Sequence, residues 1–200
     1  MNTVVVSENE IDKVVEELNK ENVVSFPTET VYGVAVKFGS HKALDRLMEA
    51  KDRDYSKAIT LMVSKIEDIN KYAYVSENAE KVIKAFMPGK ITLIFKKKET
   101  VDSYMTNGKD TIGIRIPDNK FVLNLIERTG PLLVTSANLS GHSNTTCTNE
   151  VLQQLEGRIS IIVDGKTNGD IASTVVDLTE EVKILRVGEI TKEEILEVIK

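Results

Sequence analysis

Three short polar segments together carry the side chains best suited to chemistry, and two of them follow an apolar run that could form a strand while the third closes a helical stretch. Phe26–Gly33 places two hydroxyls and a carboxylate between a proline and a glycine. Lys51–Arg53 supplies two cations, and Thr135–Gly141 supplies hydroxyls and an amide. Because loops at strand ends are where α/β proteins bind ligands, we expect the three segments to line one shared polar cavity.

Each segment also has a purely structural interpretation. Two cations beyond a helix end are usually solvated surface side chains. Ser136 and Asn138 could simply form a turn, with Asn138 in a left-handed conformation before Gly141. Glu29, between two threonines, could act as a base or could brace the backbone. Arg115 is different, because it lies in an otherwise apolar strand where a buried guanidinium needs an anionic partner.

The common nucleotide and metal motifs are not found in the sequence. Residues 160–167 come within one residue of a Walker phosphate loop, but Ser160 replaces its first glycine. The apolar triplet Ile161–Val163 should form a strand, whereas a phosphate loop needs free backbone amides. No Gly-x-Gly-x-x-Gly follows a strand, and His41 and His142 have no second ligand at metal spacing, so we expect no structural metal.

The composition indicates an ordinary globular protein with one domain over residues 1–200. Hydrophobic residues make up 41% of the chain and charged residues 28%, and 200 residues can build one sizeable core. The net charge of −5 argues against a broad nucleic-acid-binding surface. The lone Cys147 fits a reducing cytoplasm. With no leader sequence and no long apolar run, we expect a cytoplasmic protein without a membrane partner.

The elements that must position these segments alternate between amphipathic helices and short apolar strands. Ser7 and Glu10 form a capping box for a helix through Lys20, and Thr191 and Glu194 form another before a short final helix. Several strands follow one another late in the chain, which predicts an α/β fold with a mixed sheet. Further helices are expected from Ser40 to about residue 50 and at 76–86, 121–128 and 150–155, and strands at 22–26, 31–38, 58–63, 91–95, 111–116, 132–135, 159–163, 174–178 and 182–185.

Five polar segments occur in a fixed order, at Phe26–Gly33, Lys51–Arg53, Pro88–Thr92, Thr135–Gly141 and Ser173–Asp177. In this order they resemble the signature motifs of the YrdC-like domain of threonylcarbamoyl-AMP synthases. The likeness spans nearly the whole chain and is that of a stand-alone short form. It implies a twisted mixed sheet with helices packed around it and a large central cavity.

The resemblance implies an L-threonylcarbamoyladenylate synthase, a nucleotidyltransferase that forms threonylcarbamoyl-AMP and pyrophosphate from L-threonine, bicarbonate and ATP. In the family's proposed reaction, the threonine amine captures bicarbonate as a carbamate, which attacks the α-phosphate of ATP. Mg²⁺ would be carried by ATP. The product would serve the threonylcarbamoyladenosine modification of tRNA through a downstream threonylcarbamoyl transferase complex. In such a site, cations that neutralise phosphate and carboxylate should dominate.

The same resemblance implies roles for individual side chains. A central set of four polar residues would carry catalysis, and its two cations would stabilise phosphate. The four are Lys51, Arg53, Ser136 and Asn138. The residues implied to hold threonine are Thr28, Arg115, Ser136 and Ser173. Those implied to contact the nucleotide are Lys51, Arg53, Thr106, Asn138, Asn144 and Arg186.

Six positions depart from the family's pattern, and two alternative functions stay open. The departures leave the central polar set intact, yet they allow a divergent paralogue that carbamoylates and adenylates another small amine. The run Lys96–Lys98 suggests the other alternative, an RNA-binding YrdC-like module for tRNA or double-stranded RNA, although the acidic net charge argues against it. The departures are Asp54, Met62, Lys90, Asn144, Ala172 and Val187, where members of the family often have Pro, His, Pro, Ser, Glu and Pro.

Overall fold

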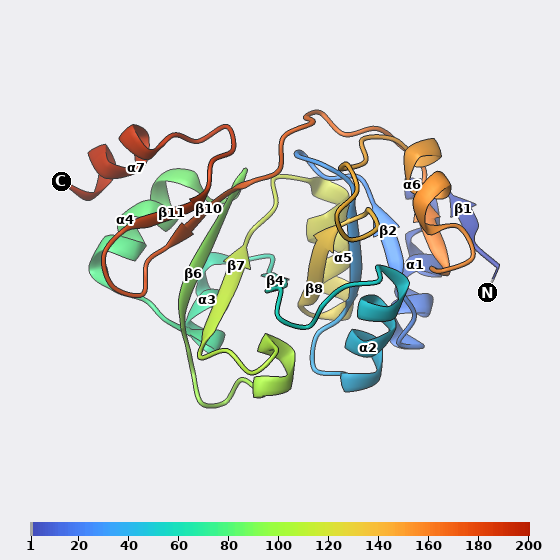
Figure 1. The fold of residues 1–200 in the computed structure, drawn as a ribbon, viewed down its shortest axis with the longest axis horizontal. Coiled ribbons are helices and arrows are strands. Elements are labelled where there is room, and N and C mark those ends of the chain that lie inside the picture. The colour runs from blue at the N-terminus through green and yellow to red at the C-terminus, as the bar shows by residue number, and fades with distance from the viewer. Residues whose placement is uncertain (1) are drawn as a thin grey trace.

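An eleven-stranded mixed sheet runs the length of the molecule, in a computed structural model that describes residues 2–200 (Figure 1). Its strand order is β1-β9-β2-β3-β8-β4-β7-β6-β10-β11, and β5 pairs with β6. The sheet contains parallel pairs such as β4 with β7 and antiparallel pairs such as β3 with β8, which confirms the predicted mixed sheet. The strands are β1 (Val4–Val6), β2 (Val24–Phe26), β3 (Gly33–Lys37), β4 (Thr60–Met62), β5 (Ala73–Tyr74), β6 (Ile91–Lys97), β7 (Thr111–Arg115), β8 (Leu132–Ser136), β9 (Ile161–Val163), β10 (Thr174–Asp177) and β11 (Lys183–Arg186).

The two faces of the sheet carry separate apolar cores, because successive side chains on a strand point to opposite faces. On β3, Val34 and Val36 belong to one core and Ala35 to the other. Helices α2, α3, α4, α6 and α7 contribute to the first core, and α1 and α5 contribute to the second. The helices are α1 (Ile11–Asn19), α2 (His41–Ala50), α3 (Ile66–Tyr72), α4 (Glu77–Phe86), α5 (Lys120–Thr129), α6 (Thr148–Leu155) and α7 (Lys192–Ile199), with single 3-10 turns at Glu8–Glu10 and Ser103–Thr106.

Most of the predicted elements are confirmed within a few residues. Both capping boxes are present, at Ser7 with Glu10 and at Thr191 with Glu194. The strand β9 occupies the apolar triplet of residues 160–167, so the rejection of a phosphate loop there is also confirmed. The sequence patterns did not predict β1, α3, β5 or the 3-10 turn at Ser103–Thr106. None of the helices in residues 2–200 is long and apolar enough to span a membrane.

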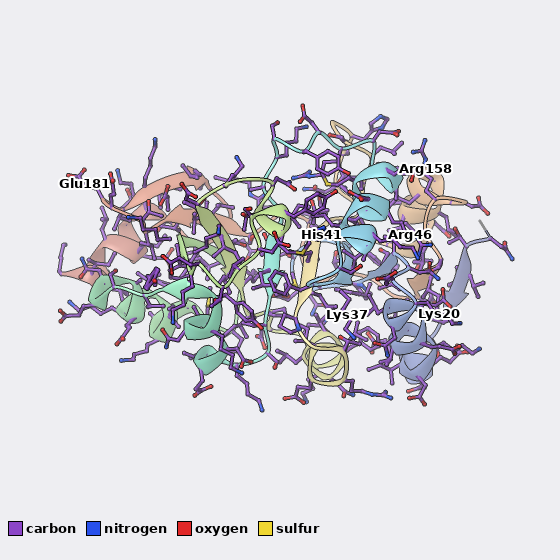
Figure 2. All side chains as sticks on the ribbon, turned by 90° about the horizontal axis from the view of Figure 1, so that it is seen from below. Lys20, Lys37, His41, Arg46, Arg158 and Glu181 are labelled. Carbon is purple, nitrogen blue, oxygen red and sulfur yellow. The ribbon has the colours of Figure 1, made fainter. Side chains whose placement is uncertain are left out.

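Helix α2 is fixed at both ends, and its C-terminal end places the basic pair. Ser40 caps the helix by accepting a hydrogen bond from the Ala43 amide at 3.1 Å. On the outer surface, Arg46 donates to the carbonyl of Glu21 at 3.0 Å and so ties the helix to the turn after α1 (Figure 2). At the other end, Asp52 adopts a left-handed conformation with φ 49°. The amide of Arg53 then bonds to the Met48 carbonyl at 3.0 Å, which is the Schellman arrangement that ends a helix.

Candidate functional site

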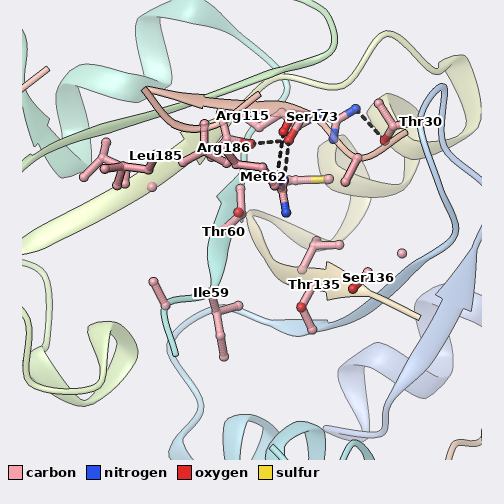
Figure 3. A pocket seen from close by; sticks show the side chains of 18 of the residues that line it. Thr30, Ile59, Thr60, Met62, Arg115, Thr135, Ser136, Ser173, Leu185 and Arg186 are labelled. Atoms are coloured by element: carbon pink, nitrogen blue, oxygen red, sulfur yellow. Dashed lines mark hydrogen bonds between the residues drawn. The ribbon is translucent and has the colours of Figure 1, made fainter. Parts of the chain in front are cut away.

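A cavity of about 330 Å³ opens over the middle of the sheet, near the lower end of the range for ligand pockets (Figure 3). The three polar segments singled out in the sequence all contribute to its lining, through Thr28, Arg53 and Ser136 among others. The structure therefore brings residues from all three segments to one cavity. The turn between β2 and β3 forms one wall, the loop after α2 forms another, and strands β4, β6 and β7 form the floor.

The turn after β2 is wound tightly because its own hydroxyls hold it. The Thr28 hydroxyl accepts a hydrogen bond from the Thr30 amide at 3.1 Å and donates to the Val31 carbonyl at 2.6 Å. The next strand begins at Gly33, where an added Cβ atom would lie 3.0 Å from Val134 Cγ1. A side chain at this position would push the turn away from β8. The Thr28 hydroxyl and Gly33 thus shape the turn locally, and the turn leaves Thr28 and Thr30 at the cavity.

At one end of the cavity, Arg115 is held by a buried carboxylate. Its Nη2 atom donates to Glu29 Oε1 at 2.6 Å and to Thr30 Oγ1 at 3.1 Å. Glu29 also accepts the Asp118 amide at 3.0 Å. This confirms the prediction that a buried guanidinium needs an anionic partner, and it favours the bracing interpretation of Glu29 over a base. The Nε atom of Arg115 is buried without a protein hydrogen-bond partner.

A second arginine reaches the same end through Ser173. Arg186 donates from Nε to the Ser173 carbonyl at 2.9 Å and from Nη2 to its hydroxyl at 3.2 Å, and that hydroxyl lies 2.9 Å from Thr92 Oγ1. Gly188 allows this close packing, because a Cβ atom there would lie 2.5 Å from the Ala172 carbonyl oxygen. Within residues 2–200, Arg186 has no carboxylate partner. Two guanidinium groups and a hydroxyl therefore converge at this end, which suits a carboxylate.

The opposite end of the cavity is lined by Arg53, Thr106 and Lys109. Arg53 donates from Nη2 to the Ala58 carbonyl at 2.8 Å, and its buried Nε has no protein partner. The Thr106 hydroxyl donates to the Lys109 carbonyl at 2.7 Å, which closes the turn that carries Lys109. Neither cation forms an ion pair with another described residue. Such a pair of cations suits the phosphates of a nucleotide.

Lys51 lies behind the cavity wall rather than in its lining. The side chain is 1% exposed, and its ammonium group donates to the backbone carbonyls of Ser136 and Asn138. Burial, followed by the positive charges of Arg53 and Lys57, lowers the pKa of Lys51 to about 7. No carboxylate approaches this ammonium group among the described residues. In this structure Lys51 therefore fixes the Ser-Ala-Asn loop to the end of α2.

The Ser-Ala-Asn loop is held from both sides, but not as the turn interpretation predicted. Asn138 donates from Nδ2 to the carbonyls of Leu139 and His142 at 2.9 and 2.8 Å. The described non-glycine residues with positive φ are Glu21, Asp52 and Asn107, so Asn138 does not take the left-handed conformation that the turn interpretation offered for it. Gly141 takes that conformation instead, with φ 87°. The two hydrogen bonds from the Asn138 side chain hold the loop together although the Asn138 backbone is not left-handed.

The candidate residues thus divide into two groups. Residues of the first group line the cavity. Residues of the second group do not line it: Asn144 is exposed, while Lys51 and Asn138 are buried behind the wall. Sequence reasoning overlooked Lys109 and Thr60. Lys109 follows a turn signal, Asn-Gly, and Thr60 alternates with apolar neighbours, so weak local signals existed. The cavity-lining candidates are Thr28, Arg53, Thr106, Arg115, Ser136, Ser173 and Arg186.

Residues 2–200 contain no group of three His, Cys, Asp or Glu side chains that could hold a metal ion. His41 is more than half exposed and lies 2.6 Å from Asp102 Oδ2. His142 is exposed as well. The interpretation of both histidines as exposed polar residues is confirmed.

Known proteins match this chain along most of its length. A model of the Sua5/YciO/YrdC family, described as telomere recombination, matches residues 16–188. The threonylcarbamoyl-AMP synthase of Pyrococcus abyssi is 37% identical over 186 residues, which cover 91% of this chain and 55% of that protein. The threonylcarbamoyl-AMP synthase of Bacillus subtilis is 38% identical over 189 residues, covering 91% and 54%.

A solved structure agrees with these sequence matches. P. abyssi Sua5 in complex with L-threonine superposes with a TM-score of 0.91 at 34% identity, over 99% of this chain and 60% of that one. In the two sequence matches, this chain spans about half the length of each relative. The family model covers well over half of the chain, and both relatives exceed 30% identity over nearly all of it. This chain belongs to the Sua5/YciO/YrdC family.

Proposed function

We propose that this protein is a threonylcarbamoyl-AMP synthase, a nucleotidyltransferase that joins L-threonine, bicarbonate and ATP. The observation that carries the proposal is one cavity with cationic groups at both ends, Arg115 and Arg186 at one and Arg53 and Lys109 at the other. The matched relatives named threonylcarbamoyl-AMP synthase and the relative solved with L-threonine support the choice of substrates.

The two ends suit the two large substrates of this reaction. The carboxylate of threonine would lie between Arg115 and Arg186, with the Ser173 hydroxyl as a third contact. The triphosphate would lie near Arg53 and Lys109, whose charges have no carboxylate to neutralise them among the described residues. Preorganised cations of this kind stabilise charge that develops in a transition state. Mg²⁺ would accompany ATP as part of the substrate.

The reaction itself needs positioning more than proton transfer. The threonine amine attacks the carbon of bicarbonate, a C–N bond forms, and water leaves to give a carbamate. A carbamate oxygen then attacks the α-phosphorus, the bond to the β-phosphate oxygen breaks, and pyrophosphate departs with the electron pair. Arg53 and Lys109 would stabilise the charge that builds up on the phosphates.

Lys51, Asn138 and Asn144 take different roles in this proposal. Lys51 would position the Ser136 loop through the two backbone carbonyls that its ammonium group holds, and Asn138 would brace the same loop from its other side. Contact of Lys51 or Asn138 with phosphate would need the loop to open when nucleotide binds. Asn144 would reach the nucleotide only from the exposed rim.

The product would be consumed by an enzyme complex that transfers the threonylcarbamoyl group to tRNA in the cytoplasm. Direct binding of RNA by this chain has less support. Lys97 donates to the Val101 carbonyl at 3.0 Å, and Lys98 lies 5.7 Å from the centroid of the Tyr74 ring, so two of the three consecutive lysines already have partners. The net charge of −5 also opposes a polyanion.

The test is release of pyrophosphate from ATP by the purified protein. We expect release only when both L-threonine and bicarbonate are present. Release that is equal without threonine would refute the proposal. A panel of other amino acids and small amines in place of threonine tests the divergent-paralogue alternative suggested by Met62, which lines the cavity near Arg115 (Figure 3).

A further inference from the structure

Between the two cationic ends of the cavity, the floor is formed by uncharged residues. On β7, the residues Arg115, Gly113 and Thr111 alternate along the strand and share one face. Arg115 belongs to one end, and Thr111 lies beside the turn that carries Lys109. Gly113 lies between them, roughly 7 Å from each along the strand. Strand β7 thus places no side chain at the midpoint between the two ends.

The neighbouring strands extend this midpoint into a row across the floor. Gly113 pairs with Ile94 of β6 on one side and with Thr60 of β4 on the other. Thr60 in turn pairs with Val134 of β8. All four residues line the cavity. The midpoint is therefore walled by two apolar side chains, floored by a glycine, and supplied with one hydroxyl from Thr60.

The fold does not require glycine at this midpoint. A Cβ atom on Gly113 would lie 3.5 Å from Thr92 Cγ2 and 3.9 Å from Ile94 Cγ1, which are ordinary van der Waals distances, and its φ is not in the left-handed region. Gly33, in contrast, would bring a Cβ atom to 3.0 Å from Val134. Glycine inside a strand weakens it. Gly113 therefore costs the sheet stability without relieving a clash.

We propose that Gly113 is a specificity-determining position that keeps a passage open between the amino-acid end and the nucleotide end. This inference rests on the proposed function, in which the carbamate formed at one end must reach the α-phosphate held at the other. Reacting atoms must approach to about 3–3.5 Å. In a cavity of about 330 Å³, a side chain at the midpoint would occupy the space where they meet. The Thr60 hydroxyl is the polar group placed to contact the carbamate there.

The test compares Gly113→Ala and Gly113→Val with the unaltered protein. Calorimetry in bicarbonate-free buffer measures binding of L-threonine alone, of ATP alone, and of ATP at saturating L-threonine. We expect each ligand alone to bind within about threefold of the unaltered protein. ATP binding in the presence of threonine should weaken at least about 10-fold in Gly113→Val, the effect of overpacking a filled site. Pyrophosphate release should fall by at least the same factor.

A compensating variant separates lost volume from lost structure. Ile94→Val shortens by one carbon the side chain whose Cγ1 atom lies 3.9 Å from the added Cβ, so Gly113→Ala with Ile94→Val should recover part of the activity that Gly113→Ala loses. Thermal unfolding of Gly113→Ala should occur at or above the temperature of the unaltered protein, because alanine is better than glycine inside a strand.

The inference and the proposed function can fail separately. Joint binding and pyrophosphate release that are unchanged in Gly113→Val would overturn the inference alone. An unaltered protein that binds both ligands but releases no pyrophosphate would refute the proposed function, while joint binding would still decide the role of Gly113. An unaltered protein that binds neither ligand would overturn both.

Discussion

The ion pair between Glu29 and Arg115 lends itself to a quantitative prediction, because it is buried and has a matched exposed counterpart. The Arg115 and Glu29 side chains are 6% and 8% exposed. Glu29→Gln keeps the shape and an acceptor for the Asp118 amide but removes the negative charge. Removing one partner of a buried ion pair costs about 3–5 kcal/mol, since the other charge is left uncompensated. The retained acceptor favours the lower value, about 3 kcal/mol.

This loss should be visible as a lower melting temperature. For a chain of this size, each kcal/mol shifts the melting temperature by about 2–4 °C, so Glu29→Gln should melt about 6–12 °C lower. The control is Glu189→Gln, which breaks the pair with Lys90 at 2.6 Å. That pair is partly exposed, and such pairs contribute about 0–1 kcal/mol. The control should therefore melt within about 4 °C of the unaltered protein.

Ligand addition tests why the variant is unstable. If Arg115 holds the carboxylate of threonine, saturating L-threonine supplies an anion in place of Glu29. Threonine should then raise the melting temperature of Glu29→Gln more than it raises that of the unaltered protein. Because a larger stabilisation by the same ligand means tighter binding, the KM for threonine should fall while the KM for ATP stays within about twofold. Equal melting of Glu29→Gln and Glu189→Gln, or a rise in the KM for ATP alone, would refute this reasoning.

Three further predictions concern the other polar groups of the site. The folded-state pKa of Lys51 is about 7 against an ordinary value of 10.5, so the unfolded chain binds more protons between these pH values and stability should rise with pH. Urea unfolding should show that the free energy of unfolding rises less between pH 7 and pH 9 in Lys51→Met than in the unaltered protein. An equal rise in both proteins would contradict the argument that burial lowers the pKa of Lys51. Arg53→Ala should lower pyrophosphate release at least about 100-fold, and a loss of only a few-fold would remove it from the phosphate end. Ser173→Ala should raise the KM for threonine about 10-fold without changing that for ATP, because the hydroxyl links Thr92 and Arg186 at the carboxylate end; equal changes in both would contradict this placement.

Helices and strands with a clear period could be read from the sequence, whereas short elements stabilised by distant partners could not. Helix α1 has an amphipathic face, and the capping box of Ser7 and Glu10 begins the 3-10 turn that leads directly into it. The three-residue strand β1 is formed by pairing with β9, more than 150 residues away, and nothing local indicates that partner. Helix α3 buries only Ile69, so its seven residues carry too little apolar periodicity to stand out.

For the site, residue type predicted convergence but not the direction of each side chain. Arg115 was recognised because a cation in an apolar strand needs an anion, and Glu29 provides it. Lys51 and Arg53 looked equivalent as a basic pair. The left-handed residue between them turns the chain, so that one side chain enters the loop behind the wall and the other enters the cavity. That separation depends on backbone geometry that a pair of charges does not reveal.

The most direct test of the proposed function is to identify the product by mass spectrometry. The purified protein is incubated with ATP, L-threonine and ¹³C-labelled bicarbonate, and the adenylate fraction is analysed. We predict a species with the mass of threonylcarbamoyl-AMP that contains the labelled carbon and disappears when threonine is omitted. An adenylate without the label, or the same product without threonine, would contradict the assignment of this cavity to the joining of threonine, bicarbonate and ATP.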